Sequence, residues 1–337
     1  MAETPQVYKR ITVRDVADRA GVSTSTVSRA LSGARAVDPA IKAKVFAIAD
    51  ELGYRPNQIA AALRQNLTRT VGFVVPDITN PYFPSLIEAL ETHLRELGIV
   101  MLLVNSANDA TVEAFGVRSL LSRNVDALFI SPCHRERSRE IIDYAARFTQ
   151  IIQVDRFAND ALPYVGVDQR TAIKELVEML RARGHSELGF VGSHDEEWPT
   201  YNRERVYREV AGAVSGNRVL QCEHTIAAGR AIGKDLPLIW PGVFGIVCAN
   251  DAVAFGVRDA LASAHPDLVD EYMITGFDNT VLAEAGHFTS VEQPIHAVAL
   301  EAMAVLSSTA ARAGDGLRAA DDRPAFIELG AEVKFRS

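Results

Sequence analysis

Residues 12–31 read Thr-Val-Arg-Asp-Val-Ala-Asp-Arg-Ala-Gly-Val-Ser-Thr-Ser-Thr-Val-Ser-Arg-Ala-Leu. This stretch predicts two short helices joined by a tight turn. Gly21 permits a left-handed backbone that a Cβ would penalise, and Ser23 can cap the second helix by accepting a backbone N–H bond. Val27 and Leu31 turn the apolar face of the second helix inward and leave its polar side chains outside. The pattern is typical of a helix-turn-helix, whose second helix enters the major groove of DNA.

The segment that follows completes a small helical module. Residues 39–52 carry apolar side chains at helical spacing and predict a third helix that ends at Gly53. Residues 54–64 then read Tyr-Arg-Pro-Asn-Gln-Ile-Ala-Ala-Ala-Leu-Arg. The proline suits a first helical turn, and the alanines favour a slim helix.

From residue 70 onward, short apolar runs rich in β-branched residues alternate with stretches of helical periodicity. Alternation of this kind predicts parallel sheets that are covered by helices on both faces. Two such units in tandem predict two Rossmann-like lobes, with a cleft at the carboxyl ends of the strands. The expected strands are 71–76, 100–105, 127–131, 151–155, 187–191, 245–249 and 273–277.

The order of these segments resembles the LacI/GalR family of bacterial transcriptional regulators. The resemblance rests on the helix-turn-helix, Leu-Gly-Tyr-Arg-Pro-Asn at 52–57, the Ala-rich segment, Thr-Val-Gly-Phe-Val-Val-Pro at 70–76 and Asn-Pro-Tyr-Phe at 80–83. It implies an all-α headpiece at 1–56, a hinge helix and linker at 57–69, and a two-lobed α/β body of the periplasmic-binding-protein type I at 70–337.

In that fold the chain passes between the lobes several times, so the lobes are not contiguous in sequence. We expect the first crossing near Asp168, the return near Gln293, and one more crossing by the last strand, near 326–329. The first lobe would then comprise about 70–167 and 294–325, and the second lobe about 168–293 and 326–337.

Charge is distributed unevenly along the 337 residues. The whole chain carries a formal net charge of −8, but residues 1–69 carry a net +5 and the remainder −13. A basic head on an acidic body places the affinity for phosphate at one end. The N-terminal residues form no apolar signal core, and no apolar run reaches membrane length, so we expect a cytoplasmic protein without membrane contact.

Neither metal binding nor catalysis has a recognisable signature. The three cysteines and eight histidines show no ligand spacing, and no nucleophile elbow, phosphate loop or zinc-peptidase motif occurs. We therefore expect no metal, no cofactor and no catalytic residues. Two classes compete: a ligand-controlled DNA-binding repressor, and a sugar-active enzyme or transport receptor. The helix-turn-helix favours the repressor.

The recognition helix supplies the candidate DNA contacts. Thr24 and Ser25 open this helix and should face base edges, and Arg29 can donate two bonds to a guanine. Short donors suited to phosphate oxygens are Thr12, Ser23, Thr26, Ser28 and Asn57. The resemblance adds Ala60 and Leu63 of the hinge helix as base contacts, with Leu63 wedged into the minor groove, and implies a homodimer on a near-palindromic operator.

Polar side chains at strand ends are the candidate contacts to a small-molecule effector, such as a sugar, polyol or related metabolite. We expect Asp155, Asn250 and Asp278 to bond ligand hydroxyls. The other candidates are Tyr82 and Phe83 as stacking rings, Ser131 and Arg156. For Asp77, Asp168 and Asp251, helix capping is an equally good interpretation.

The resemblance also assigns the residue that grips the effector. Arg203-Glu204-Arg205 resembles the family's Arg-x-Arg helix start, whose second arginine, here Arg205, binds the effector. Arg208 departs from the pattern, since the family usually has glycine at that position. Trp198 either lines the cleft or lies in a surface loop. Whether the effector releases DNA or tightens binding stays open, because the sign depends on which lobe arrangement it prefers.

Overall fold

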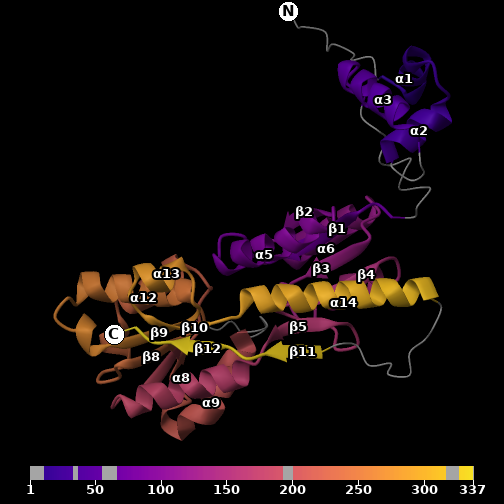
Figure 1. The fold of residues 1–337 in the computed structure, drawn as a ribbon. Coiled ribbons are helices and arrows are strands. Elements are labelled where there is room, and N and C mark those ends of the chain that lie inside the picture. The colour runs from indigo at the N-terminus through magenta and orange to yellow at the C-terminus, as the bar shows by residue number, and fades with distance from the viewer. Residues whose placement is uncertain (1–10, 33–36, 55–66, 193–199, 316–325, 337) are drawn as a thin grey trace, which may run out of the picture. The chain divides into compact units, whose positions relative to one another are not determined.

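The computed structural model of the protein describes residues 11–32, 37–54, 67–192, 200–315 and 326–336. The chain divides into two compact units, 1–68 and 69–337 (Figure 1). The boundary falls where the sequence changes from short helices to alternating strands and helices.

The first unit contains the three predicted helices α1 (Val13–Ala20), α2 (Thr24–Ser32) and α3 (Pro39–Glu51). Gly21 adopts a φ of 68° at the end of α1, as the turn requires. The core between the helices consists of small apolar side chains, with Val16, Val27 and Val45 fully buried. Small residues in the core let three short helices pack closely, and they leave the polar faces outside.

The first lobe of the second unit is built on a six-stranded parallel sheet. Its strands, in spatial order, are β11 (Phe326–Leu329), β5 (Tyr164–Val167), β4 (Gln150–Val154), β3 (Ala127–Ile130), β1 (Thr70–Val75) and β2 (Val100–Asn105). Its helices are α5 (Tyr82–Glu96), α6 (Ala110–Leu121), α7 (Arg139–Ala145) and α14 (Ile295–Asp315). Residues 71–75 of the inner strand β1 are all buried, because helices cover both faces of the sheet.

The second lobe contains another six-stranded sheet. Its strands, in spatial order, are β12 (Glu332–Lys334), β10 (Thr289–Glu292), β9 (Met273–Asp278), β8 (Gly245–Cys248), β6 (Leu188–Val191) and β7 (Val219–Leu220). All neighbours are parallel except β12, which runs antiparallel to β10. Its helical elements are α8 (Gln169–Ala182), α9 (Thr200–Ser215), α10 (Ile226–Gly233), α11 (Leu236–Ile239), α12 (Asp251–Ala264), α13 (Val281–Ala285) and the 3₁₀ turn η1 (Val269–Glu271).

The seven strands expected from the sequence are all present, each within a residue or so of its predicted limits. In the first lobe, α5 and α14 cover one face of the sheet, and α6 and α7 cover the other. In the second lobe, α8 and α9 cover one face, and α12 and α13 the other. Helices therefore cover both faces of each sheet.

The prediction for the strand at 326–329 is wrong. This strand, β11, pairs in parallel with β5 and belongs to the first sheet (Figure 1). The cause is α14, which packs against β4 and β5 and thus delivers the chain to the edge of the first sheet. The last crossing follows at Gly330, and β12 then joins the second sheet. The other crossings lie at Asp168, between β5 and α8, and at Gln293, between β10 and α14, as predicted.

Among the described residues, no helix is both long enough and apolar enough to cross a membrane.

Candidate functional site

The recognition helix α2 presents a polar surface. Thr24, Ser25 and Arg29 are exposed, whereas Val27 is fully buried. Ser23 caps the helix as predicted, since its hydroxyl accepts a hydrogen bond from the Thr26 backbone N–H at 3.1 Å. Arg29 lies back along the helix and donates from Nε to the Ser25 carbonyl at 3.1 Å. The side chains predicted to contact bases thus share one solvent-facing side of α2.

The predicted phosphate contacts flank this surface. Thr12 is the N-cap of α1, and its backbone N–H and hydroxyl both donate to Asp15 Oδ2 at 2.7 Å. Thr26 and Ser28 are half-buried on α2. The remaining predicted contacts to DNA lie outside the described residues: Asn57, Ala60 and Leu63.

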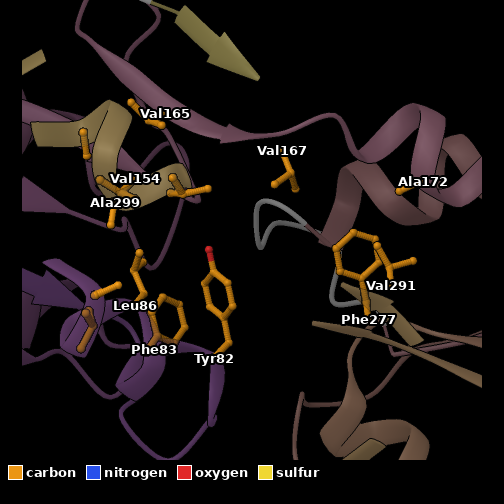
Figure 2. Close-up of a cluster of buried hydrophobic side chains, with 14 of the residues drawn as sticks. Tyr82, Phe83, Leu86, Val154, Val165, Val167, Ala172, Phe277, Val291 and Ala299 are labelled. Atoms are coloured by element: carbon orange, nitrogen blue, oxygen red, sulfur yellow. The ribbon is translucent and has the colours of Figure 1, made fainter. Parts of the chain in front are cut away.

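A second candidate site lies between the two lobes of the body. Its space is about 290 Å³, open solvent at the mouth included. Figure 2 shows two of its lining residues, Tyr82 and Phe83 from α5, within a cluster of buried hydrophobic side chains that also includes Phe277 of the second sheet. The residues that line it are Asn80, Tyr82, Phe83, Asp155, Arg156, Arg203, His224, Ala249, Asn250 and Asp278.

Each lobe contributes one buried carboxylate and one buried guanidinium to this space. In the first lobe, Arg156 Nε lies 3.6 Å from Asp155 Oδ2. In the second lobe, Arg203 Nη2 lies 3.9 Å from Asp278 Oδ1, and Nη1 of the same arginine donates to the Ala249 carbonyl at 2.6 Å. At most 7 % of any of these four charged residues is exposed, so the charges act in a medium that screens them weakly.

Burial dominates the protonation of the two carboxyl groups. It raises the pKa of Asp278 to about 7, although the positive charge of Arg203 opposes the rise. Burial also raises the pKa of Asp155 against the opposing charges of Arg156 and Arg203. Raised pKa values in a buried, charge-lined space are typical of functional sites.

The backbone at both carboxylates adopts an uncommon conformation. Asp155 has a φ of 67°, and Asp278 has a φ of 103°. Positive φ is unfavourable for residues with a Cβ, and such strain gathers at functional sites. Each sheet therefore turns its chain sharply at the point where a carboxylate faces the space between the lobes.

Six of the eight predicted effector residues line this space: Tyr82, Phe83, Asp155, Arg156, Asn250 and Asp278. Asn250 also caps α12, since its side-chain oxygen accepts from the Val253 N–H at 2.9 Å. Ser131 is fully buried at the end of β3 but does not line the space.

The structure does not place Arg205 at this space. This side chain is exposed and does not line the space, whereas Arg203 is 4 % exposed and does. Helical periodicity supplies the reason. Arg203 precedes the buried Val206 and Tyr207 by three and four residues, and therefore shares their inward face of α9. The spacing of buried side chains in α9 is the sequence signal that identifies Arg203 as the inward-facing arginine.

The three ambiguous aspartates have local structural roles. Asp77 accepts from the Thr79 N–H at 2.8 Å, and Asp168 caps α8. Asp251 accepts from the Thr280 N–H at 2.6 Å and the Ser290 hydroxyl at 2.5 Å. None of the three lines the space between the lobes.

Sequence reasoning missed His224, which lines the space from the loop after β7. One ring nitrogen, Nε2, lies 2.9 Å from the Gly192 carbonyl. No motif marks this histidine, because its place depends on how β7 joins the sheet. Asn80 also lines the space, and it accepts from the Tyr82 N–H at 3.1 Å. In the described part of the chain, no cluster of three or more His, Cys, Asp or Glu side chains has the arrangement of a metal site.

Comparison with known families identifies both units. Residues 12–57 match the model of the bacterial regulatory proteins of the lacI family. Residues 68–299, more than half of the chain, match the periplasmic binding proteins and sugar binding domain of the LacI family. The chain belongs to the LacI family. This LacI-family protein is therefore a DNA-binding transcriptional regulator, and the competing interpretation as a sugar-active enzyme or transport receptor is set aside.

Individual relatives agree with this assignment. The ribose operon repressor of Halalkalibacterium halodurans is 26% identical over 85% of this chain and 86% of its own length. The transcriptional repressor PurR of Photobacterium profundum is 27% identical over 88% and 90%. Among solved structures, the lac repressor dimer bound to operator and the anti-inducer ONPF has a TM-score of 0.82 at 18% identity, over 97% of this chain and 98% of its own.

Proposed function

We propose that this LacI-family regulator is a cytoplasmic repressor that binds a near-palindromic operator as a homodimer and responds to a small metabolite bound between its lobes. The observation that carries the proposal is the buried, charge-lined space of the body in a chain that also contains a DNA-reading helix-turn-helix. The names of two relatives, a ribose operon repressor and the repressor PurR, support the assignment as a repressor.

On the headpiece, Thr24, Ser25 and Arg29 are proposed to read base edges, because they share the exposed side of α2. Thr12, Ser23, Thr26 and Ser28 are proposed to contact phosphates and so to fix the register of the helix on DNA. Asn57, Ala60 and Leu63 complete the proposed contacts from the hinge segment. A leucine wedge at the operator centre requires two hinge segments, and hence two protomers.

Surface character supports the homodimer. Strand β2 is an edge strand of the first sheet, and its Val100 is 60 % exposed. The neighbouring helix α6 exposes 72 % of Phe115. An apolar surface beside an unpaired strand edge is a site of association, because both features are unfavourable in water.

The effector is proposed to act by selecting one arrangement of the lobes. Asp155 and Arg156 face it from the first lobe, and Arg203, Asn250 and Asp278 from the second. A ligand that bonds both sides stabilises the closed arrangement by its differential affinity for that state. The change in lobe arrangement then alters the separation of the two hinge segments in the dimer.

Selection of binding sites from random duplex DNA tests the proposal. The purified full-length protein should enrich a near-palindromic sequence, and sedimentation should show one dimer for each duplex. Recovery of a sequence without two-fold symmetry, or a monomer on the selected duplex, would contradict the dimeric mode of binding. A failure to enrich any sequence would contradict operator recognition itself.

A further inference from the structure

The space between the lobes contains buried polar atoms that have no hydrogen-bond partner among the described residues. They are Arg156 Nε and Nη1, and Arg203 Nε. All three atoms are guanidinium nitrogens, which can only donate. The orphaned acceptors nearby, Asn279 Oδ1 and Gln293 Oε1, belong to residues that do not line the space. The site therefore lacks hydrogen-bond acceptors for these donors.

The neighbouring carboxylates do not meet this need. Arg156 Nε lies 3.6 Å from Asp155, and Arg203 Nη2 lies 3.9 Å from Asp278. Both separations exceed the length of a normal N–H···O bond, which is about 2.7–3.2 Å. The carboxylates thus offset only part of the charge of the guanidinium groups, since burial raises the pKa of Asp278 to about 7, and they do not accept these hydrogen bonds.

An aromatic ring holds the guanidinium group of Arg203 in place, and a second ring lies near that of Arg156. Arg203 Cζ lies 3.6 Å from the centre of the Phe277 ring, and Arg156 Cζ lies 5.8 Å from that of Phe83. Stacking on a ring occupies one face of a guanidinium and leaves its N–H edges available in the plane. Arg203 is thus a pre-oriented donor from the second lobe, and Arg156 presents unpaired N–H groups from the first.

The two cations also repel each other. Burial lowers the pKa of Arg203, and the positive charge of Arg156 adds to this effect, whereas Asp278 and Asp155 oppose it. A negative group between the arginines would remove this repulsion and supply the missing acceptors at once. A neutral hydroxyl supplies acceptors but no compensating charge.

We infer that the effector carries one compact anionic group, a carboxylate or a phosphate, which binds between Arg156 of the first lobe and Arg203 of the second. This inference rests on the proposed function, because it assigns the chemical class of the effector at the same site. Asp155 and Asp278 remain as acceptors for hydroxyl groups of the same ligand. The effector class is therefore an acidic sugar, either a sugar acid or a sugar monophosphate.

Matched pairs of sugars test this inference by thermal shift and calorimetry on the full-length protein. The carboxylate arm compares D-gluconate with D-glucitol, D-galactonate with galactitol, and D-glucuronate with D-glucose. The phosphate arm compares the monophosphates of ribose, glucose and fructose with the parent sugars. At least one acid should bind ten or more times more tightly than its neutral parent, and the arm in which it falls identifies the anionic group.

Two variants show whether the anion binds where the geometry places it. Arg156→Met and Arg203→Met keep much of the side-chain volume but remove the donors, so each should remove the preference for the acid. Arg205→Met is the matched control on α9, because that arginine is exposed, and it should preserve the preference. Circular dichroism and affinity for selected operator DNA without ligand show that each variant is folded.

Three outcomes would overturn the inference. These are that no acid in either arm binds, that a neutral parent binds as tightly as its acid, or that both Arg→Met variants keep the acid preference while folded. The operator measurement separates the two proposals. If operator DNA binds but only neutral sugars change its affinity, the anion inference alone fails. If the wild-type protein selects no operator, the proposed function fails whatever the sugars do.

Discussion

The headpiece and the body position their functional side chains in opposite ways. In the headpiece, small apolar residues such as Val16 and Val27 fill the core, and Ser25 and Arg29 are exposed. In the body, the charged residues that face the ligand space are themselves buried, as Arg203 and Asp278 illustrate. DNA brings its own dense charge to an exposed surface, whereas a small ligand must be enclosed to be recognised.

This difference predicts how substitutions act. An exposed contact is screened by water and salt, so its loss removes only the energy of that contact. A buried charge that loses its partner leaves the other charge desolvated and unpaired, which costs considerably more. Substitutions in the body should therefore have larger effects on ligand binding than substitutions in the headpiece have on operator binding.

The largest effect is expected for Arg203→Ala. Its removal leaves Asp278 buried without its cation, so the affinity for the best-binding acidic sugar should fall by about 3 kcal/mol, or roughly 100-fold. Operator affinity without ligand should be retained. Calorimetry measures the first quantity and fluorescence anisotropy the second.

Arg205→Ala is the control for this prediction, since the two arginines lie two residues apart on α9 and differ in burial. Its ligand affinity should stay within about twofold of the wild type, as for an exposed side chain. A larger loss in Arg205→Ala than in Arg203→Ala would reverse the assignment.

A smaller effect is expected for Arg29→Ala in the headpiece. Operator affinity should fall by ~1–3 kcal/mol, and affinity for random DNA should fall less, because a guanine contact carries sequence information. Ligand affinity should not change. Arg19→Ala is the control, since Arg19 is exposed on α1 and pairs with Glu51. Equal losses on operator and random DNA for Arg29→Ala would show that this arginine contacts phosphate alone.

Asp251 should affect ligand binding without touching the ligand. Its carboxylate accepts from the Thr280 N–H and the Ser290 hydroxyl, and so fixes the turn that follows Asp278. In Asp251→Asn the amide offers one acceptor where two donors point, so the turn loses a hydrogen bond. Ligand affinity should fall by about tenfold, the equivalent of one typical hydrogen bond.

Thr275→Val serves as a control for a loss of stability alone. The Thr275 hydroxyl is buried in the same sheet and donates to the Ile246 carbonyl at 3.2 Å. This variant should lower the melting temperature of the protein without lowering its affinity for the ligand. If Asp251→Asn lowers the melting temperature but binds ligand normally, Asp251 contributes to stability and does not position Asp278.

The smallest effect is a dependence of ligand binding on pH. Asp278, whose pKa burial raises to about 7, faces Arg203 on α9, Asp251 on α12, Asp155 after β4 and Gln293 after β10. Protonation below pH 7 removes a negative charge beside the anion site, so an acidic sugar should bind more tightly at pH 6 than at pH 8. The expected difference is about three- to tenfold, because one proton is linked to binding.

Calorimetry at the two pH values measures this difference, and Asp278→Asn should flatten the profile. A neutral sugar should show little change between the same pH values. An acidic sugar that binds more tightly at pH 8 would contradict the sign of this linkage.

The contrast between the headpiece and the body also explains which features could be predicted from the sequence. The turn at Gly21, the cap at Ser23 and the apolar face of α2 depend on residues a few positions apart, so the local pattern contains the whole argument. Four of the ligand-space residues were predictable because they lie at strand ends, and strand ends of parallel sheets meet at one edge. Tyr82 and Phe83 belong to the Asn-Pro-Tyr-Phe run and lie on α5. Arg203 and His224 were not identified, because their positions depend on the orientation of α9 and on the pairing of β7.

The sequence by itself determined the helix-turn-helix, the alternation of strands and helices, and the family to which the chain belongs. These features depend on periodicity and on local backbone preferences, which are set by residues close together in the sequence. Only the tertiary structure decided that β11 joins the first sheet and that Arg203 faces the ligand space in place of Arg205. It also decided that guanidinium groups from both lobes lie buried with unpaired donors. Sheet membership and burial arise from contacts between segments far apart in the chain, and no local pattern specifies them.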